Sequence, residues 1–137
     1  MSSRSEVYDF MEEAGMLFFA TVKDNKPKLR PIGFRMMEDE QIYFVTGNKK
    51  DFYNQMVKNS NIEVVGQSGG KFLRYYGHVA FDEDEDKTLI KKAFEKMPML
   101  EKMLQGKTGQ PQVFHITKAT AEIRTHTGIV KSYNFLD

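Results

Sequence analysis

The sequence of 137 residues contains no cysteine, and this absence excludes several kinds of chemistry at once. A chain without thiols has no disulfides, no thiolate metal site, no iron–sulfur cluster and no cysteine nucleophile. Only three histidines are present, His78, His115 and His126, and a zinc site would need nearly all of them although they lie far apart in the chain. We therefore expect a function that depends neither on thiol chemistry nor on a zinc site.

An excess of charge of one sign is also lacking, since twenty basic residues stand against nineteen acidic ones. A net charge of +1 gives no general attraction for nucleic acid or for an anionic membrane. The longest apolar run, Ala14 to Ala20, is far shorter than the ~20 residues of a membrane-spanning helix. The first ten residues carry Arg4, Glu6 and Asp9 and so lack the apolar stretch of a signal peptide. We expect no nucleic-acid or membrane partner, and a cytoplasmic location.

The length predicts a single domain covering residues 1–137, because domains usually contain ~100–200 residues. A chain of this size buries ~65–70% of the surface of its unfolded form, which is enough for a core without disulfide or metal cross-links. Hydrophobic residues make up 40% of the chain and charged residues 28%, so the composition is that of an ordinary globular protein.

Apolar segments rich in aromatic and β-branched residues, separated by polar turns, predict a mainly-β fold. At the N-terminus, Ser3 and Glu6 have the spacing of a capping box, and the amphipathic pattern after them predicts a helix that ends at Gly15. Strands are predicted over residues 16–22, 29–37, 41–46, 62–67, 71–82, 113–117, 119–125 and 129–135, and helices after an N-cap at Asn48, over 89–97 and over 99–104.

The order of these segments favours an antiparallel architecture. The strands come in groups of three, two, and two or three, with helices only between the groups, whereas a doubly wound parallel sheet needs regular alternation. Pro31, inside the second strand, indicates a sheet edge or a break in the hydrogen-bonding pattern. We therefore predict a small antiparallel barrel with short flanking helices, because closure removes exposed strand edges.

Familiar catalytic motifs are missing from the chain. There is no glycine-rich nucleotide loop after a strand, no nucleophile elbow and no pair of histidines at positions i and i+4. His115 lies between Phe114 and Ile116, which is typical of a hydrogen-bonded histidine in a barrel strand.

One segment has the chemistry of an anion site. Residues 46–50 run from the end of a strand to the start of a helix, where free backbone N–H groups and a positive partial charge favour phosphate. Suitable ligands there are the hydroxyl of Thr46, the amide of Asn48 and the ammonium groups of Lys49 and Lys50. Arg30, in a neighbouring strand, would bind the same phosphate through two N–H groups. An ordinary N-cap followed by two solvated lysines is the alternative that the sequence leaves open.

The order and spacing of four segments resemble a known family. These segments are Leu29–Phe34, Ile42–Met56, Asn59–Val64 and Phe72–Val79. Together they resemble the pyridoxamine 5′-phosphate oxidase-like proteins, which share an FMN-binding split β-barrel, and the resemblance runs from about Glu12 to Phe135. It implies a Greek-key split barrel and a homodimer with two FMN sites at the interface.

The resemblance also implies roles for individual residues. Arg30 matches the strand arginine that meets the FMN phosphate, and residues 46–50 match the strand–helix junction that binds it. The implied cofactor-binding residues are Arg30, Pro31, Ile32, Gly33, Thr46, Asn48, Lys49 and Lys50, with Gln67 and Arg74 approaching the flavin from the partner subunit. Pro31, Ile32 and Gly33 would lie along the isoalloxazine edge.

Departures from the family pattern bear on the reaction. Authentic pyridoxamine phosphate oxidases are longer and carry a C-terminal tryptophan and arginine for substrate, whereas this chain has no tryptophan and ends in residues 132–137, Ser-Tyr-Asn-Phe-Leu-Asp. We expect an FMN-dependent oxidoreductase that passes electrons from a reduced nicotinamide to a small acceptor, with the cofactor supplying the chemistry. The alternative is a non-catalytic protein that stores flavin or haem, or a dimeric interaction module. Haem would need an axial ligand from one of the three histidines or a methionine.

Overall fold

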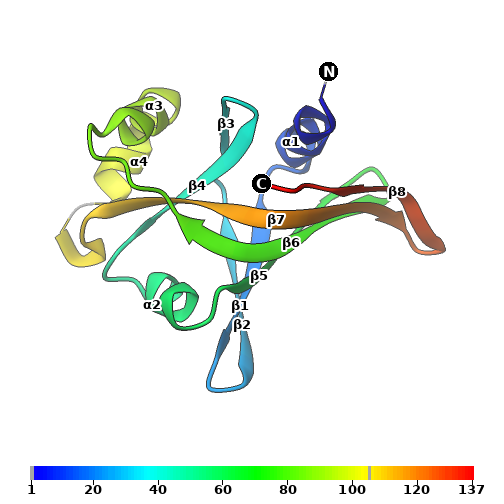
Figure 1. Ribbon diagram of the computed structural model, residues 1–137, viewed down its shortest axis with the longest axis horizontal. Coiled ribbons are helices and arrows are strands. Elements are labelled where there is room, and N and C mark those ends of the chain that lie inside the picture. Colours follow the sequence, from blue (N-terminus) through cyan, green and yellow to red (C-terminus); the bar gives the residue numbers. More distant parts are fainter. Residues whose placement is uncertain (1, 105) are drawn as a thin grey trace.

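The computed structural model describes residues 2–104 and 106–137, which form one antiparallel sheet with short helices around it (Figure 1). In chain order the elements are α1 (Ser3–Ala14), β1 (Leu17–Lys23), β2 (Lys26–Ile32), β3 (Met36–Glu38), β4 (Gln41–Gly47), α2 (Asp51–Lys58), β5 (Asn61–Ser68), β6 (Lys71–Phe81), α3 (Thr88–Lys96), α4 (Pro98–Met103), a 3₁₀ turn (Gly106–Thr108), β7 (Pro111–Thr125) and β8 (Gly128–Asn134). None of the helices among the described residues has the length and apolar character needed to cross a membrane.

The strands are hydrogen-bonded in the order β2-β1-β5-β6-β7-β4-β3, and every pair is antiparallel. β7 pairs with β6 on one edge, and its other edge pairs with β4 through residues 111–114 and with β8 through residues 120–125. Because β5, β6 and β7 are consecutive neighbours and β4 returns to lie beside β7, the connection is of the Greek-key type. The predicted mainly-β, antiparallel Greek-key split barrel with short flanking helices is confirmed.

Aromatic side chains fill the interior where the sheet curls. Leu17, Phe19 and Thr21 of β1 point inward and are buried, whereas Phe18 between them is 41% exposed, as the alternation of a half-buried strand requires. The ring of Phe19 meets the ring of Phe44 from β4 edge-to-face, with centroids 4.9 Å apart. Such pairs add about 0.5–1.5 kcal/mol beyond the area that they bury. They join β1 to β4, which are not hydrogen-bonded neighbours among the described strands.

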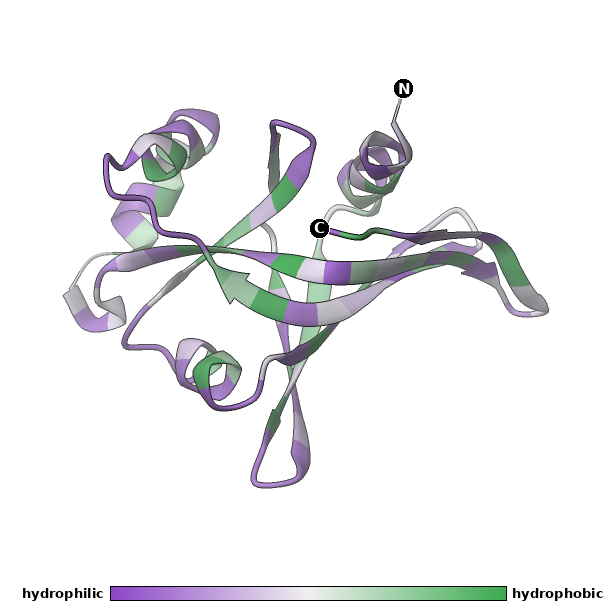
Figure 2. Cartoon of the chain, in the orientation of Figure 1, coloured by the Kyte–Doolittle hydropathy of each residue, from purple (hydrophilic) through white to green (hydrophobic). Residues whose placement is uncertain are grey.

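A second hydrophobic cluster lies under α3 and α4. Ile90 and Ala93 of α3 and Leu100 of α4 pack with Val45 of β4 and Val113 of β7. The polar residues concentrate elsewhere, as in the hydrophilic turn between β1 and β2 (Figure 2). The two helices therefore close one part of the sheet and leave the β1–β2 hairpin and α2 free to form the candidate site.

The N-terminal cap differs from the prediction. Ser2, not Ser3, caps α1, and its hydroxyl accepts a hydrogen bond from the backbone N–H of Ser5 at 3.1 Å. The carboxylate of Glu6 accepts a hydrogen bond from the hydroxyl of Tyr133 in β8 instead of folding back on the helix. Ser2 therefore holds the N-cap position, and the side chain of Glu6 is engaged with β8.

The strand predicted over residues 29–37 is in fact two strands, β2 and β3. Arg35, between them, is buried and donates from Nη1 to the carbonyl oxygen of Gly33 at 2.8 Å and from Nη2 to that of Met11 at 2.6 Å. The Met11 carbonyl already accepts the N–H of Gly15 at 3.1 Å, so Arg35 adds a second donor at the C-terminal end of α1. The break between β2 and β3 thus contains a buried arginine that ties this segment to α1.

The two strands predicted over residues 113–117 and 119–125 form one continuous strand, β7. Lys118, between them, adopts a left-handed conformation with φ of 51°, and the pairing with β6 shifts register between Tyr76 and His78. Gly77 lies at this bulge, where a Cβ atom would come within 2.7 Å of the carbonyl oxygen of Thr117. A glycine in β6 therefore permits β7 to continue.

Candidate functional site

A groove of about 560 Å³ lies between β2 and the start of α2. It is lined by Lys28, Leu29, Arg30, Pro31, Ile32, Lys50, Asp51, Phe52 and Gln55. Four of the residues predicted from the sequence, Arg30, Pro31, Ile32 and Lys50, are thus brought together from two elements. Three cationic side chains and one carboxylate give the groove a formal surplus of two positive charges.

The edge position of β2 explains its two prolines. Among the described strands, β2 pairs only with β1, so the missing N–H groups of Pro27 and Pro31 interrupt no hydrogen bonding inside the sheet.

The first turn of α2 forms the opposite wall of the groove through Asp51 and Phe52. N–H groups in the first turn of a helix have no partner within the helix and carry a positive partial charge, which favours an anion.

Arg30 is held in place before any ligand arrives. Its Nη1 donates to the hydroxyl of Thr21 at 2.8 Å and to the carbonyl oxygen of Phe19 at 3.2 Å, and its Nη2 donates to Oε1 of Gln55 at 2.6 Å. The guanidinium carbon also lies 4.6 Å from the ring centre of Phe52. Burial lowers the pKa of Arg30 and the nearby carboxylate of Asp51 opposes this, but a guanidinium remains charged.

The hydrogen bonds of Arg30 leave part of its binding capacity for a ligand. A guanidinium carries five N–H donors, and three are engaged in these contacts. The N–H on Nε and one N–H on Nη2 have no partner among the described residues. Two N–H groups of one rigid, charged plane are suited to bind two oxygens of a phosphate.

Gln55 is a site residue that the sequence analysis missed. It is only 7% exposed, and its Oε1 accepts hydrogen bonds from Arg30 and from the hydroxyl of Thr21, both at 2.6 Å. The sequence feature that could have revealed Gln55 is a polar residue on the buried face of α2, between Phe52 and Met56, where an apolar side chain is usual.

The predicted strand–helix junction is arranged differently from the expectation. Asn48 does not cap α2, since Lys50 holds the N-cap position without a side-chain hydrogen bond. The backbone N–H groups of Asn48 and Lys49 donate to the carbonyl oxygens of Gln110 and Thr108, at 2.9 and 3.0 Å. The segment before β7 therefore uses the amides that were predicted to bind phosphate, and of this junction only Lys50 lines the groove.

The other junction residues are close by but differently engaged. Asn48 Oδ1 accepts a hydrogen bond from the N–H of Gln110 at 3.0 Å, and the side chain of Lys49 is exposed. Thr46 is buried, and its hydroxyl has no hydrogen-bond partner among the described residues. Gly47 allows the backbone at Thr108 to lie close against the end of β4, because a Cβ atom at residue 47 would be 2.2 Å from the carbonyl oxygen of Thr108.

Gly33, Gln67 and Arg74 do not line this groove. Gly33 follows β2 near the side chain of Met16, and Gln67 is exposed in β5. Arg74 of β6 binds the carboxylate of Glu63 with two hydrogen bonds, of 2.8 and 3.0 Å. Gln67 and Arg74 were predicted to act from a partner subunit, so their distance from the groove of their own chain agrees with that prediction without testing it.

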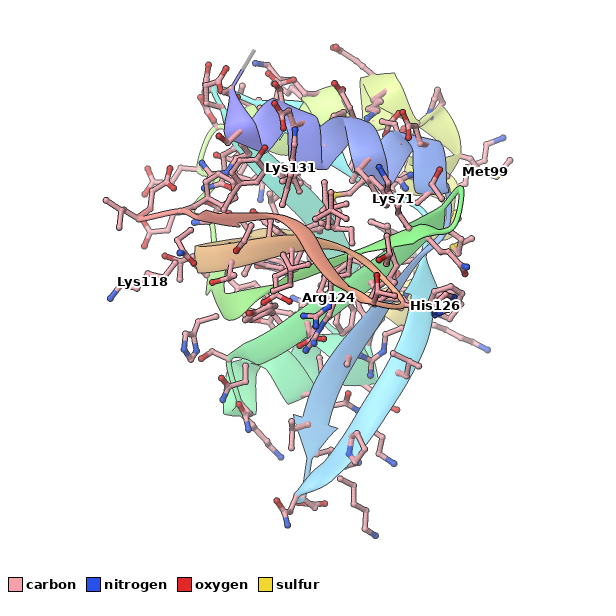
Figure 3. All side chains as sticks on the ribbon, turned by 90° about the vertical axis from the view of Figure 1, so that its right-hand side faces the viewer. Lys71, Met99, Lys118, Arg124, His126 and Lys131 are labelled. Carbon is pink, nitrogen blue, oxygen red and sulfur yellow. The ribbon has the colours of Figure 1, made fainter. Side chains whose placement is uncertain are left out.

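Arg74 belongs to a row of charged and polar side chains on the outer face of the sheet. The hydroxyl of Tyr76 donates to Glu122 at 2.7 Å, and Arg124 also binds Glu122. The hydrogen bond from Tyr76 lowers the pKa of Glu122. Arg124 extends from β7 near the turn that carries His126 (Figure 3).

The histidines have separate surroundings. His115 Nδ1 lies 2.9 Å from Oδ2 of Asp82, which agrees with the predicted structural role. His78 is exposed, and its Nδ1 lies 3.0 Å from the hydroxyl of Ser60. Within the described residues, no three side chains of His, Asp or Glu lie together as a metal site would require.

Comparison with known proteins identifies the family. A model of the pyridoxamine 5′-phosphate oxidase family matches residues 3–126, and the chain belongs to this family. A search of curated proteins finds no significant match.

Solved structures share the fold over nearly the whole chain. A NimC/NimA family protein from Clostridium acetobutylicum has 26% identity and a TM-score of 0.82, with 98% of this chain and 95% of that chain covered. A haem-binding protein from Mycobacterium smegmatis has 7% identity and a TM-score of 0.73, with 98% and 58% covered. A pyridoxamine 5′-phosphate oxidase-related, FMN-binding protein from Nostoc punctiforme has 13% identity and a TM-score of 0.61, with 100% and 98% covered.

Proposed function

We propose that this chain binds FMN in the groove between β2 and α2 and serves as an oxidoreductase, passing electrons from a reduced nicotinamide to a small acceptor. The observation that carries the proposal concerns Arg30. Hydrogen bonds to Thr21 and Gln55 fix its guanidinium group, two of its N–H groups have no partner among the described residues, and the groove that it lines has a surplus of two positive charges. A phosphate monoester carries a charge of about −1.5 to −2 at neutral pH, which this surplus balances. Family membership supports the proposal.

The residues of the chain would bind and orient the cofactor. Arg30 and Lys50 hold the phosphate, and Thr21 and Gln55 keep Arg30 in position. Pro31 and Ile32 line the same groove and would lie along the edge of the isoalloxazine ring. When bound, FMN supplies the capacity to take up a hydride and release electrons, so no acid–base residue of the protein is required. We also propose a cytoplasmic location, where reduced nicotinamide is present.

The proposal includes a homodimer. Met16, Phe18 and Leu29 of the β1–β2 region are 51%, 41% and 68% exposed, which is unusual for large apolar side chains so close together. A second copy related by a two-fold axis would cover them and bring its Arg74 toward the flavin. Light scattering should give about twice the chain mass, and Phe18→Asp, at a position that does not line the groove of the proposed site, should give a monomer with weaker FMN binding. A monomeric wild type that binds FMN would contradict the shared site.

A second candidate function is haem binding without catalysis. A groove of about 370 Å³ on the outer face is lined by His78 with Ala20, Val22 and Pro27 among others. Because Nδ1 of His78 is held by Ser60, its Nε2 is available as an axial ligand.

The absorption spectrum of the purified protein separates the two functions. Loaded with FMN, the protein should retain bands near ~370 and ~450 nm after gel filtration, and NADH or NADPH should bleach them. A Soret band that disappears in His78→Ala would instead favour haem. Retained flavin that only dithionite reduces would favour storage of the cofactor over catalysis.

A further inference from the structure

A second groove, of about 450 Å³, adjoins the first along the same helix. It lies between α2 and the β1–β2 turn and is lined by Val22, Lys23, Asp24, Asn25, Asp51, Asn54, Gln55, Lys58 and Asn59. Asp51 and Gln55 line both grooves, so the two grooves meet at these residues.

The two grooves differ in charge. The cations Lys23 and Lys58 of the second groove are balanced by the carboxylates of Asp24 and Asp51, whereas the first groove has its surplus of two positive charges. Side-chain amides form much of the remaining wall, from Asn25, Asn54, Gln55 and Asn59. This lining suits an uncharged group with many hydrogen-bond donors and acceptors.

Gln55 points to a ligand that spans both grooves. Arg30 has only donors, so the atom of Gln55 that faces it must be Oε1, and the orientation of the amide is fixed. Its Nε2 then has no hydrogen-bond partner among the described residues, and Gln55 lines both grooves. The N–H groups of this amide are therefore free to donate to a ligand that occupies the two grooves.

We infer that the flavin ligand extends past its first phosphate into the second groove, so that the chain accepts FAD. The inference rests on the proposed function. The pyrophosphate of FAD lies at Arg30, Lys50 and the Nε2 group of Gln55, and its adenosine enters the second groove. A pyrophosphate diester carries two negative charges, about the same as the phosphate of FMN, so the surplus of the first groove serves both.

The chemistry of adenosine matches the second groove. Carboxylates bind ribose hydroxyls in nucleotide sites, and Asp24 offers one at the β1–β2 turn. Side-chain amides bind the edge of adenine through two hydrogen bonds, and Asn54 offers one from α2. The volume of the groove lies within the range of ~300–1,000 Å³ that is usual for small-molecule sites.

Calorimetric titration of the whole protein with riboflavin, FMN and FAD tests the inference. FAD should bind at least as tightly as FMN. Asn54→Ala should weaken FAD about 5- to 150-fold by removing two neutral hydrogen bonds, and Asn54→Trp, which fills the groove, should weaken it at least as much. Both variants should leave FMN within about twofold of the wild type. Val57→Ala, on the same helix but lining neither groove, is the matched control.

The possible failures are distinguishable. FAD that binds much more weakly than FMN, or an Asn54→Trp variant that loses FMN and FAD equally, would overturn the inference while FMN binding keeps the proposed function. A wild type that binds none of the three flavins would overturn both.

Discussion

Replacing Lys50 with alanine separates phosphate recognition from folding. Its side chain is exposed, lines the first groove and makes no ion pair with the described residues. A charge-assisted hydrogen bond contributes about 1.5–3 kcal/mol, and solvent exposure places Lys50 at the lower end of this range. Lys50→Ala should therefore raise the Kd for FMN about tenfold. It should leave riboflavin binding and the Tm unchanged, because riboflavin has no phosphate and an exposed lysine adds little stability.

Arg30→Ala should act on both binding and stability. The loss of two charge-assisted hydrogen bonds should raise the Kd for FMN by more than about 100-fold. The variant also leaves Gln55 with one partner fewer and removes the contact with Phe52, which together cost about 1–3 kcal/mol of unfolding free energy. For a chain of this length, the Tm should fall by about 3 °C or more for each kcal/mol.

Fluorescence titrations of FMN and riboflavin, with thermal melts of the protein without flavin, measure these effects. Lys49→Ala is the matched control, since Lys49 is adjacent to Lys50 and exposed but does not line the groove. Equal losses of FMN and riboflavin would assign the residues to the ring or to folding. Unchanged FMN affinity in both Lys50→Ala and Arg30→Ala would refute the groove as the phosphate site.

Contacts elsewhere in the molecule lead to two more expected outcomes. The hydrogen bond from Arg4 lowers the pKa of Asp137. The ionised carboxylate therefore stabilises the fold above about pH 4, and this stabilisation is lost as the pH falls through the lowered pKa. Asp137→Asn should remove that part of the acid dependence in thermal melts. Gly77→Ala should lower the free energy of unfolding, measured in urea, by about 1–3 kcal/mol, because the added Cβ would collide with the carbonyl oxygen of Thr117. Gly33→Ala is the control: a Cβ there would lie 3.8 Å from its nearest neighbour, the side chain of Met16, and the free energy should change by less than about 0.5 kcal/mol.

Local patterns predicted the elements well, and long-range contacts explain where they failed. The apolar run over residues 16–22 correctly predicted the strand β1, because residue type is a local signal, whereas the exposure of Phe18 beside the buried Phe19 appears only in the structure. At the break between β2 and β3, Arg35 donates to the carbonyl of Met11, 24 residues away, and no local pattern contains that contact. The bulge at Lys118 likewise depends on Gly77 in another strand.

In the candidate site, too, local sequence predicted some residues and long-range contacts determine the others. Arg30 and Lys50 were predicted from residue type and order, and the structure brings them to one groove. Asn48 and Lys49 were included because a strand–helix junction was expected to leave its backbone N–H groups free, but the segment before β7 binds their backbone amides. Gln55 was missed because its role arises only when α2 packs beside β1 and β2.

The position of β7 has a consequence for how the chain is made. β7 is the only described strand that pairs with three others, and residues 111–125 leave the ribosome after β4 and β6, with which they pair. Until then, β4 and β6 each expose an edge that later pairs with β7, and such edges invite pairing with other chains. Pairing between residues so far apart in sequence is also slow compared with local folding. A chain interrupted before residue 111 should therefore aggregate rather than accumulate as a smaller folded barrel.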